Sequence, residues 1–277
     1  MKKGVLVCKK YIPLNQGGNK ELQVTQTLRA HPHIIKLLDY KLNKKRAILY
    51  VECHSQTLLD VILQGVDIPQ IKKMLAQLAV ALQSIHDLGY VHRNISGENV
   101  LIDSHNDVVI SNFSSAMSYR ASNQERYSFP DVPRQISPDG PEFDIWSLGV
   151  CLLMLVTSSF PFGNIPSEID IFLHTEEIQS SLRLLLQDLD PLLQDLLLGM
   201  LEIDPQKRIK LSGILSHPWL ADYESQLIAQ HHNASQEAPD KQKDSHKASK
   251  KYHSCDIGGR ITRQVIKALS SNLLRQR

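Results

Sequence analysis

The fold of this chain is indicated most clearly by residues 90–102, which read YVHRNISGENVLI. A long segment with apolar residues at helical spacing, Pro69 to Leu88, precedes this stretch, and Gly89 suits the position after a last helical turn. Two short apolar segments follow, residues 100–102 and 108–110, separated by the turn-forming letters SHND. We therefore predict a loop that leaves a long helix and enters a β-hairpin.

Further blocks extend this pattern along the chain. Upstream stands HPHIIKL, and downstream follow ISNFS, FPDV, PEFDIWSLGV, LEIDPQKR and HPWL (residues 31–37, 110–114, 129–132, 141–150, 201–208 and 217–220). In order and spacing these blocks resemble the protein kinase superfamily, with its H-R-D, D-F-G and A-P-E motifs. The resemblance covers residues 4–220 and is nearest to serine/threonine kinases of the calcium/calmodulin-dependent and AMP-activated branches.

The resemblance implies an α+β, bilobal protein-kinase-like fold. We expect a truncated N-terminal β lobe in residues 1–52 and a largely helical C-terminal lobe in residues 53–220. The chain begins at what looks like the third strand of the family, so we expect the glycine-rich loop and two strands to be missing. Residues 221–258 are polar and poor in large apolar side chains, which predicts a disordered linker. Residues 259–277 form a basic amphipathic pattern, which predicts a helix docked on its own domain, on a partner or on a membrane surface.

The catalytic positions that the resemblance identifies are altered. Asn94 stands where the family has the Asp that accepts a proton, and Ser96 stands in the place of the loop Lys. Asn112 replaces the magnesium-binding Asp of D-F-G, Ser114 replaces its glycine, and Asn99 remains at the other metal position. A neutral amide has little basicity, and Mg²⁺ prefers carboxylates. These replacements predict a degenerate catalytic and metal site.

Four residues fall where the resemblance places contacts to ATP. Lys10 is our choice for the third-strand lysine, with Lys9 as the alternative. Its partner would be Glu21 on a short helix C; the alternative is a solvated pair. Val51 and Cys53 lie at the other nucleotide positions. We expect no required cofactor, with ATP and Mg²⁺ bound weakly if at all.

The structural positions of the family are largely kept. Asp144 resembles the helix residue that binds the catalytic-loop backbone, and Asp131 with Arg208 matches a buried ion pair. His92 is expected to pack in the core. Arg93 is expected either to lie at the surface or pair locally, or to receive a phosphate from a nearby serine.

Bulk properties narrow the functional classes. A formal charge of +2 over 277 residues favours no nucleic-acid partner, and no apolar stretch is long enough for a bilayer or a signal peptide. The four scattered cysteines predict neither a disulfide framework nor a zinc site, and favour a cytoplasmic or nuclear, reducing location. We interpret the chain as a catalytically inactive kinase-like scaffold or regulator with protein partners, such as an active kinase or its substrate. The alternatives are a weak or atypical serine/threonine kinase and a truncated isoform.

Overall fold

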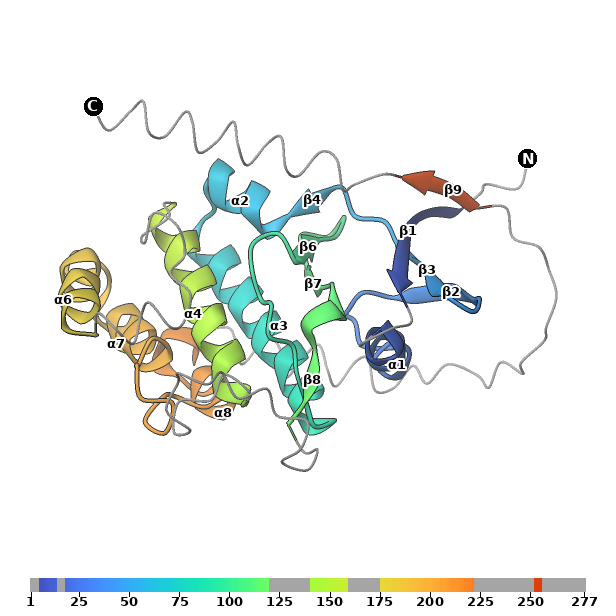
Figure 1. The fold of residues 1–277 in the computed structure, drawn as a ribbon. Coiled ribbons are helices and arrows are strands. Elements are labelled where there is room, and N and C mark those ends of the chain that lie inside the picture. The colour runs from blue at the N-terminus through green and yellow to red at the C-terminus, as the bar shows by residue number, and fades with distance from the viewer. Residues whose placement is uncertain (1–4, 14–17, 120–139, 159–174, 222–251, 256–277) are drawn as a thin grey trace.

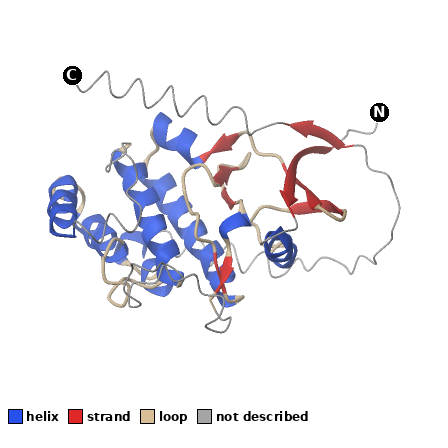
Figure 2. Cartoon of the chain, viewed as in Figure 1, coloured by secondary structure: helices blue, strands red, loops and turns tan. Residues whose placement is uncertain are grey.

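A computed structural model describes residues 5–13, 18–119, 140–158, 175–221 and 252–255 of the chain. The described residues form a small sheet with one helix beside it and a larger, mostly helical part (Figure 1). Most strands lie on one side of the molecule and most helices on the other (Figure 2). This separation confirms the expected α+β architecture with a small sheet-containing lobe and a helical lobe.

The small lobe is built on a four-stranded sheet in the order β2-β3-β1-β9. Strand β3 (Arg46–Glu52) is the antiparallel neighbour of both β1 (Val5–Pro13) and β2 (Leu37–Leu42). Strand β9 (Tyr252–Cys255) adds to the free edge of β1 in parallel, with Val5 opposite Tyr252 and Cys8 opposite Cys255.

Strand β9 corrects the expectation of a disordered linker at these four positions. The composition of residues 221–258 is polar, but a strand edge offers unpaired N–H and C=O groups that a short extended segment can satisfy whatever its composition. The rest of that linker, and the helix predicted over residues 259–277, lie outside the described residues apart from Ala221.

Helix α1 (Gly18–Thr27) lies against the sheet and connects the two hydrophobic clusters. Its Leu22 packs with Ile12, Ala47 and Leu49 in the small cluster under the sheet. Its Val24 belongs to the main core of the molecule. The helix therefore places Glu21, which directly precedes Leu22 and is buried, at the boundary between the lobes.

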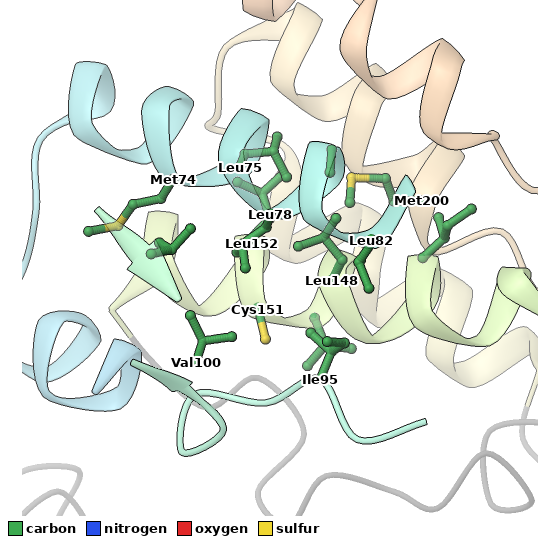
Figure 3. Close-up of a cluster of buried hydrophobic side chains, with 14 of the residues drawn as sticks. Met74, Leu75, Leu78, Leu82, Ile95, Val100, Leu148, Cys151, Leu152 and Met200 are labelled. Carbon is green, nitrogen blue, oxygen red and sulfur yellow. The ribbon is translucent and has the colours of Figure 1, made fainter. Parts of the chain in front are cut away.

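The helical lobe surrounds α3, the long helix predicted from the sequence. This helix spans Ile68–Asp87, with Asp67 as its N-cap and Gly89 at φ 83° just after its end. The other helices are α2 (Leu58–Gln64), α4 (Pro141–Thr157), α6 (Thr175–Leu186), α7 (Pro191–Met200) and α8 (Leu211–Leu215), with a 3-10 turn at Pro218–Leu220. Figure 3 shows the core between α3 and α4, where Leu78, Leu82, Leu148 and Leu152 meet.

Two small sheets frame the loop at residues 92–99. One has the order β4-β6-β7, from strands Gln56–Thr57, Val100–Ile102 and Val108–Ile110. The other pairs β5 (Tyr90–Val91) with β8 (Met117–Ser118), and a 3-10 turn, η1, covers Phe113–Ser115. The predicted hairpin at residues 100–110 is thus present. Among the described residues, no helix has both the length and the apolar content that crossing a membrane needs.

Candidate functional site

Asp144 organises the loop that follows the long helix. It lies in the first turn of α4 and is fully buried. Its two carboxylate oxygens accept from the backbone N–H groups of His92 and Arg93, each at 2.8 Å, and one also lies 2.9 Å from His86 Nε2. A buried carboxylate with three such partners is well compensated for its lost hydration. Asp144 therefore makes the loop-backbone contacts that its position in the sequence suggested.

His92 lies in the interior, as expected, with both ring nitrogens engaged. Its Nε2 lies 2.9 Å from the carbonyl oxygen of Ser111, its Nδ1 lies 3.2 Å from the backbone N of Asn94, and its ring meets Phe113 edge-on. An N–H donor at Nε2 and an acceptor at Nδ1 describe a neutral imidazole. Burial lowers the pKa of His92, and this effect outweighs the opposing influence of the Asp144 charge. His92 is thus a neutral bridge between the loop and the segment after β7.

Lys10 and Glu21 form an ion pair between β1 and α1. Lys10 Nζ lies 2.5 Å from Glu21 Oε1; the glutamate side chain is 4% exposed and the lysine side chain 38%. The alternative of a solvated pair does not describe this geometry, because the carboxylate is removed from water. Lys9, the other candidate for this position, is exposed and lies over the ring of Tyr50.

The two predicted metal positions bind each other. Asn112 Nδ2 donates to Asn99 Oδ1 at 2.8 Å, and Asn112 Oδ1 accepts from Lys10 Nζ at 2.7 Å and from the Ser114 hydroxyl at 2.8 Å. Asn99 Nδ2 in turn donates to the carbonyl of Asn94 and to the Ser96 hydroxyl, each at 3.0 Å. Asn112 has left-handed backbone angles, φ 64° and ψ 69°, which asparagine tolerates better than most residues. The result is a continuous chain of polar contacts from Glu21 to Ser96, which we call the amide network.

This donor set does not fit a magnesium ion. Mg²⁺ requires oxygen ligands, usually including carboxylates, in a near-octahedral arrangement. Here Asn99 Oδ1 accepts from an N–H group, and Asn112 Oδ1 accepts from an ammonium group and a hydroxyl, so a cation would compete with these donors for neutral amide oxygens. The described part of the chain also contains no cluster of three or more His, Cys, Asp or Glu side chains able to hold a metal.

The two altered loop positions, Asn94 and Ser96, lie just before the turn at residues 97–99. Asn94 contributes its backbone N–H to His92 and its carbonyl to Asn99, while Ser96 contributes its hydroxyl to Asn99. Neither side chain carries a charge. The turn thus keeps its shape through main-chain contacts, and it presents neither an acid nor an ammonium group where the resemblance expects them.

Val51 and Cys53 are half-buried beside β1, and their role near a nucleotide stays a prediction. Val51 is the register partner of Cys8, and the sulfur of Cys53 lies 2.7 Å from that of Cys8. Cys8 stands two residues before Lys10 on β1, so it shares the face of the strand that carries Lys10.

Arg208 and Arg93 have different surroundings. Arg208 is buried; it donates to the carbonyls of Glu142, Glu202 and Ile203 and lies over the ring of Trp146. Its predicted partner Asp131 lies outside the described residues. Arg93 has φ 63° and places Nη1 3.4 Å from the sulfur of Met117, while its buried Nε has no hydrogen-bond partner in the described structure. Arg93 is therefore half-buried and locally paired, which agrees with one of the expected arrangements.

Sequence reasoning did not identify His86 and Ser111 as contributors to this site, and it identified Ser114 without its contact to Asn112. His86 binds Asp144, the Ser111 hydroxyl donates to the Asn99 carbonyl at 2.8 Å, and Ser114 donates to Asn112. His86 follows Leu82 by four residues and so falls on the apolar face of the helix, where a polar side chain signals an internal partner. The two serines carry no comparable signal, because serine is common in loops.

Comparison with known proteins gives a consistent family. The protein kinase domain model matches residues 3–220. A "probable serine/threonine-protein kinase" of Dictyostelium discoideum is 35% identical over 180 residues, covering 61% of this chain and 11% of that protein. A carbon catabolite-derepressing protein kinase of Candida glabrata is 30% identical over 217 residues, covering 74% of this chain and 35% of the relative.

A third relative, the serine/threonine-protein kinase SIK2 of Gallus gallus, is 28% identical over 218 residues, covering 73% of this chain and 26% of the relative. The chain thus spans 11% to 35% of the length of these three relatives. The match over residues 3–220 includes both lobes and the whole amide network. The resemblance read from the motifs is confirmed, and the chain belongs to the protein kinase superfamily.

Proposed function

We propose that this chain is a kinase-fold protein that does not transfer phosphate and acts by binding other proteins, as a scaffold or regulator. The observation that carries the proposal is the amide network, in which Asn99 and Asn112 bind each other and Lys10. Phosphoryl transfer depends on positioned metal ions and charges rather than on covalent chemistry by the protein. A site whose metal positions are neutral and mutually satisfied lacks these requirements.

The base position supports the same proposal. Asn94 cannot accept a proton from a substrate hydroxyl near neutral pH, and a positioned base contributes a factor of about 10² to 10⁴ in rate. Ser96 supplies no positive charge for a transferring phosphate. These losses add to the loss of metal binding, because each removes a separate part of the catalytic arrangement.

The proposed partners are proteins, such as an active kinase or a substrate of one. The segment at residues 259–277, with its basic amphipathic pattern, is a candidate docking element. Soluble protein partners of this kind suit a cytoplasmic or nuclear location.

A second candidate, a weak or atypical serine/threonine kinase, is favoured by one observation. The ion pair between Lys10 and the buried Glu21 keeps a positive charge beside the place expected for the nucleotide phosphates. That charge could hold ATP without metal. Under this alternative ATP would bind, and transfer would depend on Lys10.

The test compares the wild-type chain with Asn94→Asp, Asn112→Asp and the double variant. Each protein is incubated with radiolabelled ATP and either Mg²⁺ or Mn²⁺, together with a mixed peptide substrate, and thermal unfolding is recorded with and without nucleotide. We expect no transfer above background by the wild-type chain or either single variant, and no metal-dependent stabilisation of the wild-type chain. A ligand that binds only the folded state at 100 times its dissociation constant would stabilise it by about 2.7 kcal/mol.

Lys10→Met is the matched control for a contaminating kinase. Transfer by the wild-type chain that is abolished in Lys10→Met would overturn the proposal and establish the weak kinase. Transfer that persists in Lys10→Met comes from another protein in the preparation. Saturable ATP binding without transfer would still agree with the proposal, since a binding module can retain its nucleotide.

A further inference from the structure

Two cysteines meet where the small sheet joins the helical lobe. Cys8 Sγ lies 2.7 Å from Cys53 Sγ, although the residues are 45 positions apart in the chain. Cys8 is on β1 and its register partner on β3 is Val51. Cys53 comes two residues after Val51, so it occupies the diagonal position on the same face, where cross-strand side chains reach each other. The contact therefore follows from strand register and not from closeness in sequence.

The two sulfur atoms need little further movement to form a bond. A disulfide joins its sulfur atoms at about 2.05 Å, and pairs whose backbones hold the side chains apart cannot form one. Here the backbones of two hydrogen-bonded strands already direct both side chains toward each other. Both residues are half-buried, so a small oxidant can reach them while water does not dominate their surroundings.

Cys151 provides an internal comparison. It is 2% exposed in the core between α3 and α4, and burial raises the pKa of its thiol to about 12. The thiolate is the reactive form of cysteine, so Cys151 is unreactive in the folded protein. Cys151 is therefore shielded from solvent, whereas Cys8 and Cys53 are half-buried and lie with their sulfur atoms close together.

We propose that Cys8 and Cys53 are a redox modification site, which a peroxide converts to an intramolecular disulfide. One thiolate attacks the peroxide: an S–O bond forms, the O–O bond breaks, and the departing hydroxide takes a proton to become water. The second thiolate then attacks the sulfenic sulfur: the S–S bond forms, the S–O bond breaks, and a second water leaves. The two thiols lose two electrons and two protons, and one hydrogen peroxide becomes two water molecules.

The bond would join β1 to the segment between the lobes. Cys8 lies two residues before Lys10, and Cys53 leads from β3 toward β4 and α2. Oxidation therefore fixes the strand that carries Lys10 against the connection between the lobes, on the face where nucleotide contacts are expected. The proposal does not depend on whether the chain transfers phosphate.

A third cysteine defines the strongest competing pairing. The parallel register of β1 and β9 places Cys255 opposite Cys8. A bond from Cys8 to Cys255 would attach the tail strand to the sheet, whereas a bond to Cys53 stays within residues 5–53. The two pairings are separable, because the three cysteines fall in different tryptic peptides, residues 4–9, 47–72 and 252–260.

The experiment treats the reduced full-length chain with a small molar excess of hydrogen peroxide. Remaining thiols are alkylated with iodoacetamide in denaturant, and tryptic peptides are identified by mass spectrometry. We expect a cross-link between peptides 4–9 and 47–72 with the mass of two hydrogens lost, reversed by dithiothreitol. Cys151 should be recovered fully alkylated. A predominant Cys8–Cys255 cross-link, a cross-link between two molecules, or separate oxidation of Cys8 and Cys53 to sulfinic acids would overturn the proposal.

Single serine variants test the assignment. Cys8→Ser and Cys53→Ser should each abolish the cross-link, while Cys151→Ser and Cys255→Ser should retain it. In the wild-type chain, oxidation should also slow amide exchange of β1 and β3 several-fold, with no such change in oxidised Cys53→Ser. Because the cross-link is mapped in the unaltered chain, the result stands even where one variant folds poorly. A cross-link that survives in Cys53→Ser would contradict the proposed pairing.

Discussion

The small sheet and the helical lobe are stabilised to very different extents. The cluster under the sheet contains four buried residues, Ile12, Leu22, Ala47 and Leu49. The cluster of the helical lobe extends through α2, α3, α4, α6, α7 and α8 (Figure 3). Because hydrophobic stabilisation grows with the apolar area removed from water, the helical lobe holds most of the free energy of folding. The small lobe depends more on what surrounds it.

Polar contacts follow the same division. In the helical lobe Asp144 and Arg208 are buried and bind several backbone groups each, which ties distant segments to a single arrangement. In the small lobe the edge of β1 is paired by β9, a four-residue segment from the far end of the chain. Glu21 and Lys10 then join the small lobe to the amide network. The comparison teaches that the helical lobe has a large core of its own, to which α1 adds Val24, while the small lobe has a small core and an edge strand from far along the chain.

The largest expected effects come from matched leucine truncations, one in each lobe. Leu82 of α3 and Leu49 of β3 are both almost completely buried. A buried Leu→Ala change costs about 2–5 kcal/mol, from lost transfer energy and the cavity left behind. We expect Leu82→Ala to lower the global free energy of unfolding by this amount. Leu49→Ala should instead increase local opening of the small lobe.

Native-state hydrogen exchange distinguishes the two outcomes. For Leu49→Ala, amide protection should fall in β1, β2 and β3 and stay close to the wild-type value in α3 and α4. For Leu82→Ala, protection should fall throughout the helical lobe. The exposed residue Leu42, changed to Ala, is the control and should alter neither. Equal loss of protection in both lobes for Leu49→Ala would show that the lobes unfold as one unit, against the comparison.

Much of this fold could be predicted from the sequence, since its long elements carry strong periodic signals. The long helix α3 and the hairpin of β6 and β7 both appear where their residues indicated. Less of the small lobe could be predicted from the sequence. Strand β9 could not be found, because four residues in a polar segment carry no periodicity and their pairing depends on an unfilled edge elsewhere in the chain.

The candidate site shows the same limit. Motif order identified Lys10, Asn94, Asn99, Asn112 and Asp144 as positions, and the structure brings them together. Motif order could not show that the amide oxygens of Asn99 and Asn112 already accept hydrogen bonds, because hydrogen-bond partners depend on side-chain placement. Nor could cysteine spacing reveal the contact between Cys8 and Cys53, since it arises from the register of β1 on β3.

A smaller effect, on pH dependence, tests the helical lobe through His92. Its pKa in the folded state is lowered by burial below the ordinary value of 6.5, so the unfolded chain binds a proton first as the pH falls. The stability that comes from keeping His92 neutral is therefore fully present above about pH 6.5 and is lost progressively below it. One such group changes the free energy of unfolding by at most about 1.4 kcal/mol per pH unit.

Urea unfolding between pH 8 and pH 5 measures this slope. His92→Gln can accept and donate hydrogen bonds but cannot titrate, so we expect a lower stability at pH 8 and a shallower loss on acidification. His54, whose pKa is also lowered by burial, retains its own contribution in both proteins. If the wild-type chain and His92→Gln lose stability with the same slope, the pH dependence comes from other groups. Protonation of His92 would then not be what destabilises the helical lobe in acid.

The smallest expected effect concerns strand β9, which pairs with the edge of β1 in the small lobe. Successive amides in a strand point to opposite sides, so the double change His253→Pro, Ser254→Pro removes one donor that faces β1. One ladder hydrogen bond contributes about 1 kcal/mol, which corresponds to roughly fivefold faster local opening. We expect that increase in the amide exchange of β1, none in α3, and none anywhere for His253→Ala, Ser254→Ala. If amide exchange in β1 is unchanged in the proline variant, pairing with β9 does not stabilise β1.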